Sequence, residues 1–149
     1  VIIHSTRAPI ATCSSLFASN FGQHSPYYNS LDHLSHFYGC YRRLMAHWES
    51  VLSPPLTHIH YEKLILTPEE EIRRLVKGAG LDWDDRCMAF YENQRSVLTA
   101  SYGQVRMPLY TGSLDRWRPF ASRLSALDNL KMEERALLSA ERQPMGAGL

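Results

Sequence analysis

The spacing of hydrophobic residues changes along the chain and predicts alternating strands and helices. Residues 1–5 are a short apolar, β-branched run of the kind that forms a buried strand. Apolar side chains then recur at helical spacing, which predicts a helix from Pro9 to about Asn20. Proline suits the first turn of a helix, and Gly22 supplies the stop.

The next segments repeat this order. A polar loop at 23–30 leads into a long amphipathic helix at about 31–52, whose apolar face comprises Leu34, Phe37, Tyr38, Tyr41, Leu44, Met45 and Trp48. Residues 57–61 predict a second strand with His58 and His60 on one side and Ile59 on the other.

A third helix start is marked by three signals in a row. Thr67 is a capping residue, Pro68 suits the first helical position, and three glutamates follow near the positive end of the helix dipole. This helix is predicted to run to about Ala79 and to end at Gly80.

The last third of the chain has weaker patterns. They predict a short helix at 82–93, an irregular segment at 95–110, helices at 115–122 and 131–141, and a disordered Gly/Pro-rich tail at 143–149.

Strand, helix, helix and strand in this order predict an α/β unit with a parallel sheet. Two strands do not make a stable sheet alone, and the chain opens directly in a strand without Met. We therefore expect a partial domain over residues 1–142.

Composition sets the broad class. The 149 residues are 44% hydrophobic and 21% charged, typical of a globular domain, with no apolar run long enough to span a membrane and no secretory signal. The net charge of +1 does not favour nucleic acid. Cys13, Cys40 and Cys87 lack C-x-x-C spacing, so we expect a reducing, cytoplasmic location.

The basic residues are 13 Arg and only 3 Lys. Arginine suits phosphate and carboxylate groups, although coding bias explains the excess equally well. Arg7 follows the first strand, and the next helix carries Ser14 and Ser15. Because ligands bind beyond the carboxyl ends of parallel strands, these groups predict an anion site; the alternative is a surface arginine beside a helix start.

Other polar clusters predict no site. His58 and His60 on a strand, and His33 and His36 on a helix, lack an evident third ligand, so no metal is expected. The pair at 84–85 is interpreted as a helix cap, and no catalytic grouping is visible in the sequence order.

The stretch from His4 to Phe17 resembles the 3′-phosphate motif of sulfotransferases. It is closest to the bacterial and tyrosylprotein-sulfotransferase branch, where R-x-P-x-x-T-C-x-S-x-F is typical. The resemblance implies that Arg7 and Ser15 bind the 3′-phosphate of PAPS (3′-phosphoadenosine 5′-phosphosulfate). Ala8 stands where an acid is common, and Ser19 where tyrosylprotein enzymes use a second basic residue.

Two further stretches support the resemblance. Residues 60–64 with Pro68 are similar to the x-Y-E-x-L…P signature, and residues 99–117 are similar to T-x-S-x-x-Q-V-R-x-P-x-Y-x-x-S-x-x-R-W. The resemblance implies that Tyr61 lies near the adenine, although a core aromatic is the alternative. It further implies that Ser101 and Arg116 contact the cofactor, that Arg106 ranks behind them, and that Trp117 belongs to the core.

The resemblance implies an α/β, P-loop-NTPase-like sulfotransferase fold, with helices flanking a parallel sheet. Members of the family hold the 5′-phosphosulfate in a Gly/Ser/Thr-rich loop after their first strand. This sequence shows no such loop and no catalytic base. We therefore expect that the N-terminal strand-loop-helix is missing, name no catalytic residue, and expect this chain alone to be inactive.

The implied activity is transfer of a sulfonate from PAPS to an acceptor hydroxyl or amine, with this chain carrying the 3′-phosphate and adenosine half of the cofactor site. The acceptor class stays open among carbohydrate, peptide tyrosine, lipid and small metabolite. A nucleotide kinase would require G-x-x-x-x-G-K-[ST], which is absent. The remaining alternative is a non-catalytic module that binds a nucleotide or a protein.

Overall fold

The computed structural model describes residues 1–19, 26–96 and 103–130. The chain divides into two compact units. The sheet unit comprises Val1–Thr6 and Leu52–Ser113, and the helical unit comprises Arg7–Val51 and Leu114–Leu149. The predicted helix at 131–141 and the predicted tail at 143–149 lie outside the described residues.

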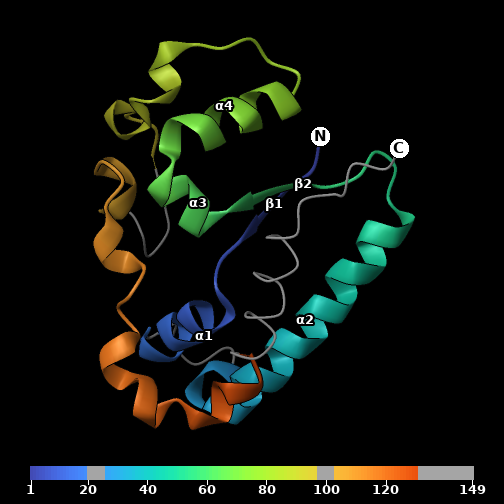
Figure 1. Cartoon of the computed structure of the whole chain (residues 1–149), viewed down its shortest axis with the longest axis vertical. Coiled ribbons are helices and arrows are strands. Elements are labelled where there is room, and N and C mark those ends of the chain that lie inside the picture. Colours follow the sequence, from blue (N-terminus) through green and yellow to red (C-terminus); the bar gives the residue numbers. More distant parts are fainter. Residues whose placement is uncertain (20–25, 97–102, 131–149) are drawn as a thin grey trace, which may run out of the picture. The chain divides into compact units, whose positions relative to one another are not determined.

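The regular elements follow the predicted order of strand, helices, strand and helices (Figure 1). They are β1 (Ile3–Thr6), α1 (Pro9–Ala18), α2 (Leu31–Val51), β2 (Thr57–His60), α3 (Tyr61–Leu66) and α4 (Pro68–Gly78). Short 3₁₀ helices cover Pro26–Asn29, Asp85–Cys87, Phe90–Glu92, Gln104–Arg106, Thr111–Ser113, Arg118–Arg123 and Ser125–Leu127. No helix within the described ranges combines the length and apolar character needed to cross a bilayer.

The two strands pair in parallel, which confirms the predicted parallel sheet for this pair. His4 lies opposite His58, and Thr6 lies opposite His60. The backbone N–H of Thr57 donates to the carbonyl of Ile2 at 3.0 Å, next to the first paired position. The carboxyl ends of β1 and β2 are therefore level with one another.

The prediction that the first strand is buried is wrong. The exposed fractions of Val1, Ile2 and Ile3 are 73%, 53% and 47%. A parallel strand is buried when helices or other strands cover both of its faces. Within the described part of the chain, β1 has only β2 as a strand neighbour, so its apolar side chains stay open.

Helix α4 begins and ends where the sequence predicts. Pro68 is its first residue, and glutamates 69–71 occupy its first turn. Thr67 is the N-cap residue, but its hydroxyl donates backwards to the carbonyl of Lys63 at 3.1 Å and does not cap α4. At the other end, the N–H groups of Gly80 and Leu81 donate to the carbonyls of Lys77 and Val76, which is a Schellman motif.

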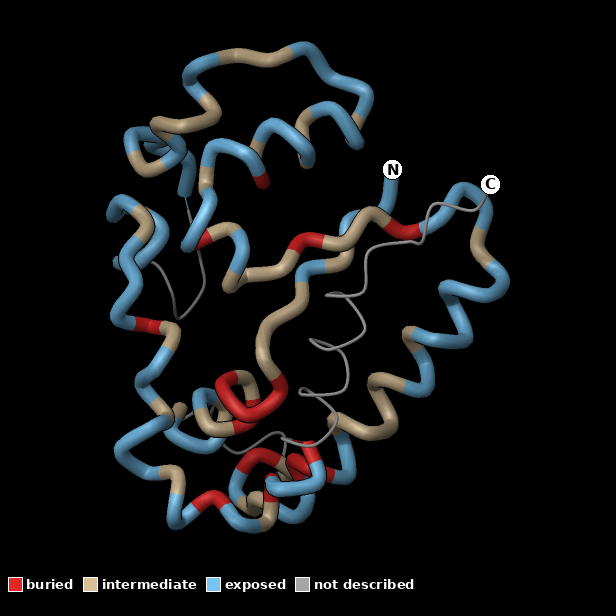
Figure 2. The backbone as a smooth tube through the Cα atoms, viewed as in Figure 1, coloured by how far each residue is buried: buried red, intermediate tan, exposed pale blue. Residues whose placement is uncertain are grey.

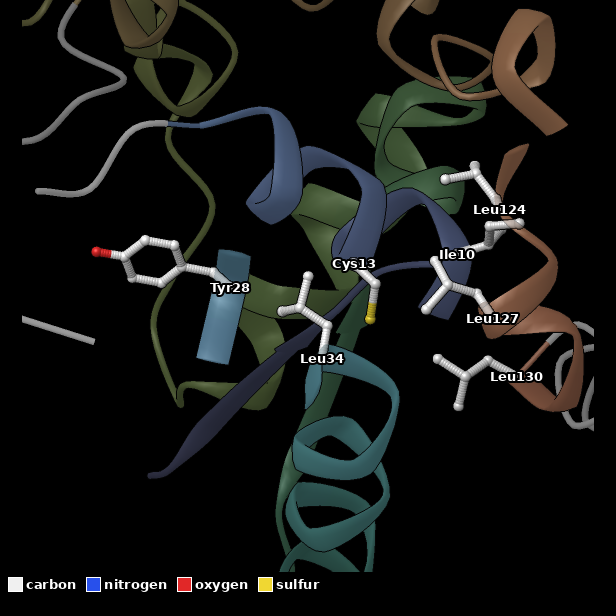
Figure 3. Packing of buried hydrophobic residues seen from close by; sticks show 7 residues of the cluster. All are labelled: Ile10, Cys13, Tyr28, Leu34, Leu124, Leu127 and Leu130. Carbon is white, nitrogen blue, oxygen red and sulfur yellow. The ribbon is translucent and has the colours of Figure 1, made fainter. Parts of the chain in front are cut away.

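A single hydrophobic core organises the helical unit. Ile10 and Cys13 from α1 and Leu34 from α2 are almost fully buried together with Leu127 and Leu130. Figure 3 shows these side chains meeting from α1, α2 and the segment that ends at residue 130. This packing fixes the orientation of α1 within the unit.

Burial of α2 is limited to its beginning (Figure 2). Leu34 and Ser35 are its buried residues, and the Ser35 hydroxyl donates to the Asn129 side chain at 3.1 Å. Farther along the predicted apolar face, Leu44 and Trp48 are exposed. Helix α2 is thus anchored to the core of its unit by its first turns.

Two predicted helices are replaced by 3₁₀ turns. At 82–93, the Trp83 indole donates to Asp85, and the Asp84 carboxylate accepts from the backbone and side chain of Arg86. Such local contacts compete with α-helical hydrogen bonds. At 115–122, Pro119 would fall in the interior of the helix, where it has no N–H to donate, and the structure forms a 3₁₀ helix from Arg118 instead.

Helix α3 is an element that the sequence pattern missed. The predicted strand extends to Tyr61, whereas β2 ends at His60 and Tyr61 is already the first residue of α3. A helix of six residues is too short to show a clear helical period. Tyr61 therefore lies at a helix start immediately beyond the sheet.

Helix α4 is tied to β2 through the side chain of Arg74. The buried Glu71 carboxylate accepts from the Arg74 guanidinium at 2.7 Å, and Arg74 also donates to the carbonyl of His58 at 2.6 Å. The hydrogen bond from Arg74 is the main cause that lowers the pKa of Glu71 below its ordinary value of 4.5.

Gly80 is expected to be sensitive to substitution. Its φ is +73°, a region where a side chain is strained, and no atom lies within 4 Å of an added Cβ. Gly80→Ala should therefore lower the free energy of unfolding by about 1–2 kcal/mol through the backbone alone. Gly103 is equally open but has a φ of −70°, so Gly103→Ala should be neutral or stabilising. Urea titration of both variants measures the two effects. Equal losses in both variants would contradict this account.

Glu71→Gln is expected to lower stability at neutral pH. Because the folded pKa is below the unfolded one, the ion pair stabilises above pH 4.5 and loses its contribution as the pH falls through the folded pKa. The difference from wild type should be about 1–3 kcal/mol at pH 7 and should shrink in acid. Glu69→Gln breaks an exposed pair with Arg73 and should cost about 0.3–0.5 kcal/mol. A pH-independent Glu71 effect would refute the assignment.

Candidate functional site

Arg7 stands directly between β1 and α1. It is half-buried, and its backbone carbonyl accepts from the Thr12 hydroxyl at 3.5 Å. The Thr12 N–H donates to the carbonyl of Ala8, the N-cap residue of α1, at 2.9 Å. These contacts hold the Arg7 backbone against the first turn of α1, because Thr12 belongs to that helix.

Helix α1 presents different chemistry on its two sides. Ile10 and Cys13 face the core, and burial raises the pKa of the Cys13 thiol to about 11, so that thiol stays neutral. Ser15 is exposed, whereas the half-buried Ser14 hydroxyl donates to the carbonyl of Ala11 at 3.2 Å. Of the two serines in the predicted anion site, Ser15 is the one that α1 turns to its open side.

The N-terminal turn of α1 suits an anion. It contains no acidic side chain, Ala8 provides no side-chain cap, and Pro9 occupies the first helical position. A helix N-terminus carries a partial positive charge. Ser15 lies six residues beyond Pro9, a rise of about 9 Å along the helix. Arg7 therefore immediately precedes the electropositive start of α1, whereas Ser15 lies farther along the helix.

Arg116 belongs to the same unit. It is exposed and precedes Trp117, which is partly buried and packs against the core that α1 also builds. The predicted core role of Trp117 is confirmed. Asp115 and Arg118, which flank Arg116 and Trp117, form an ion pair at 2.6 Å, so their charges offset each other.

Tyr61 lies in the sheet unit. Its hydroxyl is 2.7 Å from the hydroxyl of Ser113, which in turn donates to the carbonyl of Tyr110 at 3.4 Å. Ser113 is buried. The hydrogen bond joins two stretches that are 52 residues apart and that each carry a family-like pattern.

Ser113 is a residue that the sequence interpretation did not single out. The sequence did contain a signal for this residue, because Ser113 is the serine of the segment that resembles Y-x-x-S-x-x-R-W. The predicted contact Ser101 lies outside the described residues. Arg106, the lower-ranked candidate, donates to the carbonyl of Arg95 at 3.2 Å and belongs to the sheet unit.

The structure thus brings Arg7, Ser15 and Arg116 into the helical unit and places Tyr61 in the sheet unit. Two surface hollows in the sheet unit, one at the start of α4 and one at residues 84–93, contain none of these residues. The helical unit thus contains an always-charged guanidinium, a hydroxyl and a helix N-terminus, each of which is a kind of group that binds phosphate.

Comparison with known proteins identifies the family of the chain. An uncharacterized protein of Aquifex aeolicus (strain VF5) is 30% identical over 135 residues, which cover 89% of this chain and 18% of that protein. The chain thus spans less than a fifth of the length of this relative. A family model described as "Sulfotransferase family" matches residues 1–85, which include Arg7, Ser15 and Tyr61. The chain belongs to the sulfotransferase family.

Proposed function

We propose that the protein is a sulfotransferase that moves a sulfonate group from PAPS to an acceptor hydroxyl or amine. This chain carries the 3′-phosphate and adenosine half of the cofactor site. The observation that carries the proposal is the succession of β1, Arg7 and α1, with Ser15 on the open side of that helix. The family match covers these residues. Within the family, the chain belongs with the bacterial and tyrosylprotein branch.

Arg7 and Ser15 bind the 3′-phosphate in this proposal. Arginine offers a fixed fork of donors for phosphate oxygens, and the serine hydroxyl adds a further donor. The half-buried position of Arg7 limits competition from water, which strengthens a charge-assisted hydrogen bond. Because the 3′-phosphate does not react, this contact orients the cofactor and selects PAPS over ATP.

The other assigned residues complete the cofactor contacts. Arg116 adds a second guanidinium from the helical unit, and Tyr61 and Ser101 contribute to binding of the nucleoside. The hydroxyl of Tyr61 bonds to Ser113, so the aromatic ring is the part of Tyr61 that meets the base. In-line sulfonate transfer then depends on positioning and charge stabilisation, as phosphoryl transfer does.

Calorimetric titration with adenosine 3′,5′-bisphosphate tests the role of Arg7. Arg7→Ala should weaken binding by about ten- to a hundred-fold, since it removes hydrogen bonds to a charged group. Arg123→Ala removes an exposed arginine of the same unit and should leave affinity unchanged. Adenosine 5′-monophosphate lacks the 3′-phosphate and should bind equally weakly to wild type and Arg7→Ala. Equal losses in Arg7→Ala and Arg123→Ala would reduce Arg7 to a general charge effect.

Two substitutions at Tyr61 separate its ring from its hydroxyl. Tyr61→Phe should cost about 0.5–1.5 kcal/mol of stability through the lost Ser113 bond, yet keep nucleotide affinity. Tyr61→Ala should in addition weaken nucleotide binding by about 1–3 kcal/mol, the value of a base stacked on an aromatic ring. Unfolding and binding measured on both variants decide the matter. Unchanged affinity in a folded Tyr61→Ala protein would make Tyr61 a structural aromatic.

A further inference from the structure

Two histidines face each other across the strand pair of the sheet unit. His4 on β1 lies opposite His58 on β2, and their Nδ1 atoms are 3.1 Å apart. The ring centroids are 5.1 Å apart, and the ring planes meet at 67°. Both side chains are partly buried. The strand register thus sets two imidazole nitrogens at close range.

The next pair along the same face differs. Side chains two residues apart share one face of a strand, so Thr6 and His60 follow His4 and His58. The Nδ1 atom of His60 is 2.7 Å from the hydroxyl of Thr6. His60 therefore meets a hydroxyl across the strands, whereas the ring nitrogens of His4 and His58 lie within hydrogen-bond distance of each other.

The nitrogen spacing fits a single metal ion. Zinc binds histidine nitrogen at about 2.0–2.1 Å. Two nitrogens 3.1 Å apart then subtend about 95–102° at the ion, between octahedral and tetrahedral angles. Imidazole ligands favour zinc, copper, nickel and iron over magnesium or calcium.

The supporting backbone is held from several sides. Parallel pairing fixes His4 against His58, and Arg74 from α4 donates to the His58 carbonyl at 2.6 Å. The charge of Arg74 is offset by the buried Glu71 carboxylate, which it contacts at 2.7 Å. Ligands held on paired strands lose little freedom on binding, which favours affinity.

We propose that His4 and His58 form a two-histidine site for a borderline divalent transition metal ion, with Zn²⁺ the best match, and with water completing the coordination. Such an ion cross-links β1 and β2 through two ligands that are 54 residues apart in the sequence. An ion that binds the folded chain more tightly than the unfolded one stabilises the fold. The site is independent of the proposed sulfonate transfer, in which no metal takes part.

Calorimetric titration of the chain with ZnCl₂ tests the proposal. Wild type should bind one ion, and His4→Gln or His58→Gln should each weaken that binding at least about tenfold. His60→Gln is the matched control on the same sheet face and should bind like wild type. A folded wild-type chain that binds no zinc, or that binds it equally after His58→Gln, would overturn the proposal.

A second measurement covers the case in which the variants fold poorly. Nitrogen NMR of the histidine side chains in wild type reports each ring directly. Zinc should shift the Nδ1 resonances of His4 and His58 and leave those of His33 and His36 on α2 unchanged. If His36 responds instead, the ion lies on α2, where its Nε2 atom is 3.6 Å from the Cys40 sulfur, and the strand-pair site is refuted.

Discussion

The parallel, in-register pairing of β1 and β2 is the constraint on which the sheet unit depends. Because Thr6 pairs with His60, the two strands end at the same level. The residue after each strand end is Arg7 in one case and Tyr61 in the other, and each opens a helix-forming stretch with a family-like pattern. A one-residue slip in register would change which residues lie opposite each other at the strand ends. It would also turn the side chains of the slipped strand to the opposite face. The same register places His4 against His58.

The core of the helical unit carries the second requirement, which is a fixed orientation of α1. Ile10 and Cys13 are buried against Leu34 and the residues around Leu127, so the opposite side of α1 is held open. The side of α1 that packs in the core and the side proposed to bind phosphate are thus different sides of one helix. The core residues determine where Ser15 points, and the first turn of α1 holds the backbone of Arg7. A substitution in this core that rotates or shifts α1 would therefore also move Ser15 and alter the proposed phosphate contact.

The sequence predicted the elements that have strong local signals. Helices α1, α2 and α4 have clear helical periods or end signals, such as Pro68 and Gly80, and the parallel pairing followed from element order. It failed where tertiary context decides: the burial of β1 depends on neighbouring elements, and the turns near Asp84 depend on side-chain contacts with the backbone. The contact of Tyr61 with Ser113 spans 52 residues, which no local pattern reveals. The sequence did predict that Arg7 lies between a strand and a helix and that Ser15 lies on that helix, because a strand, an arginine and a helix follow one another directly.

The central claim is that Arg7 and Ser15 bind the phosphate of the cofactor that does not react. A crystal structure of the chain with adenosine 3′,5′-bisphosphate tests it most directly. The account predicts the 3′-phosphate within hydrogen-bond distance of the Arg7 guanidinium and the Ser15 hydroxyl. A bound nucleotide whose 3′-phosphate lies away from both residues would contradict the account, whatever the family of the chain.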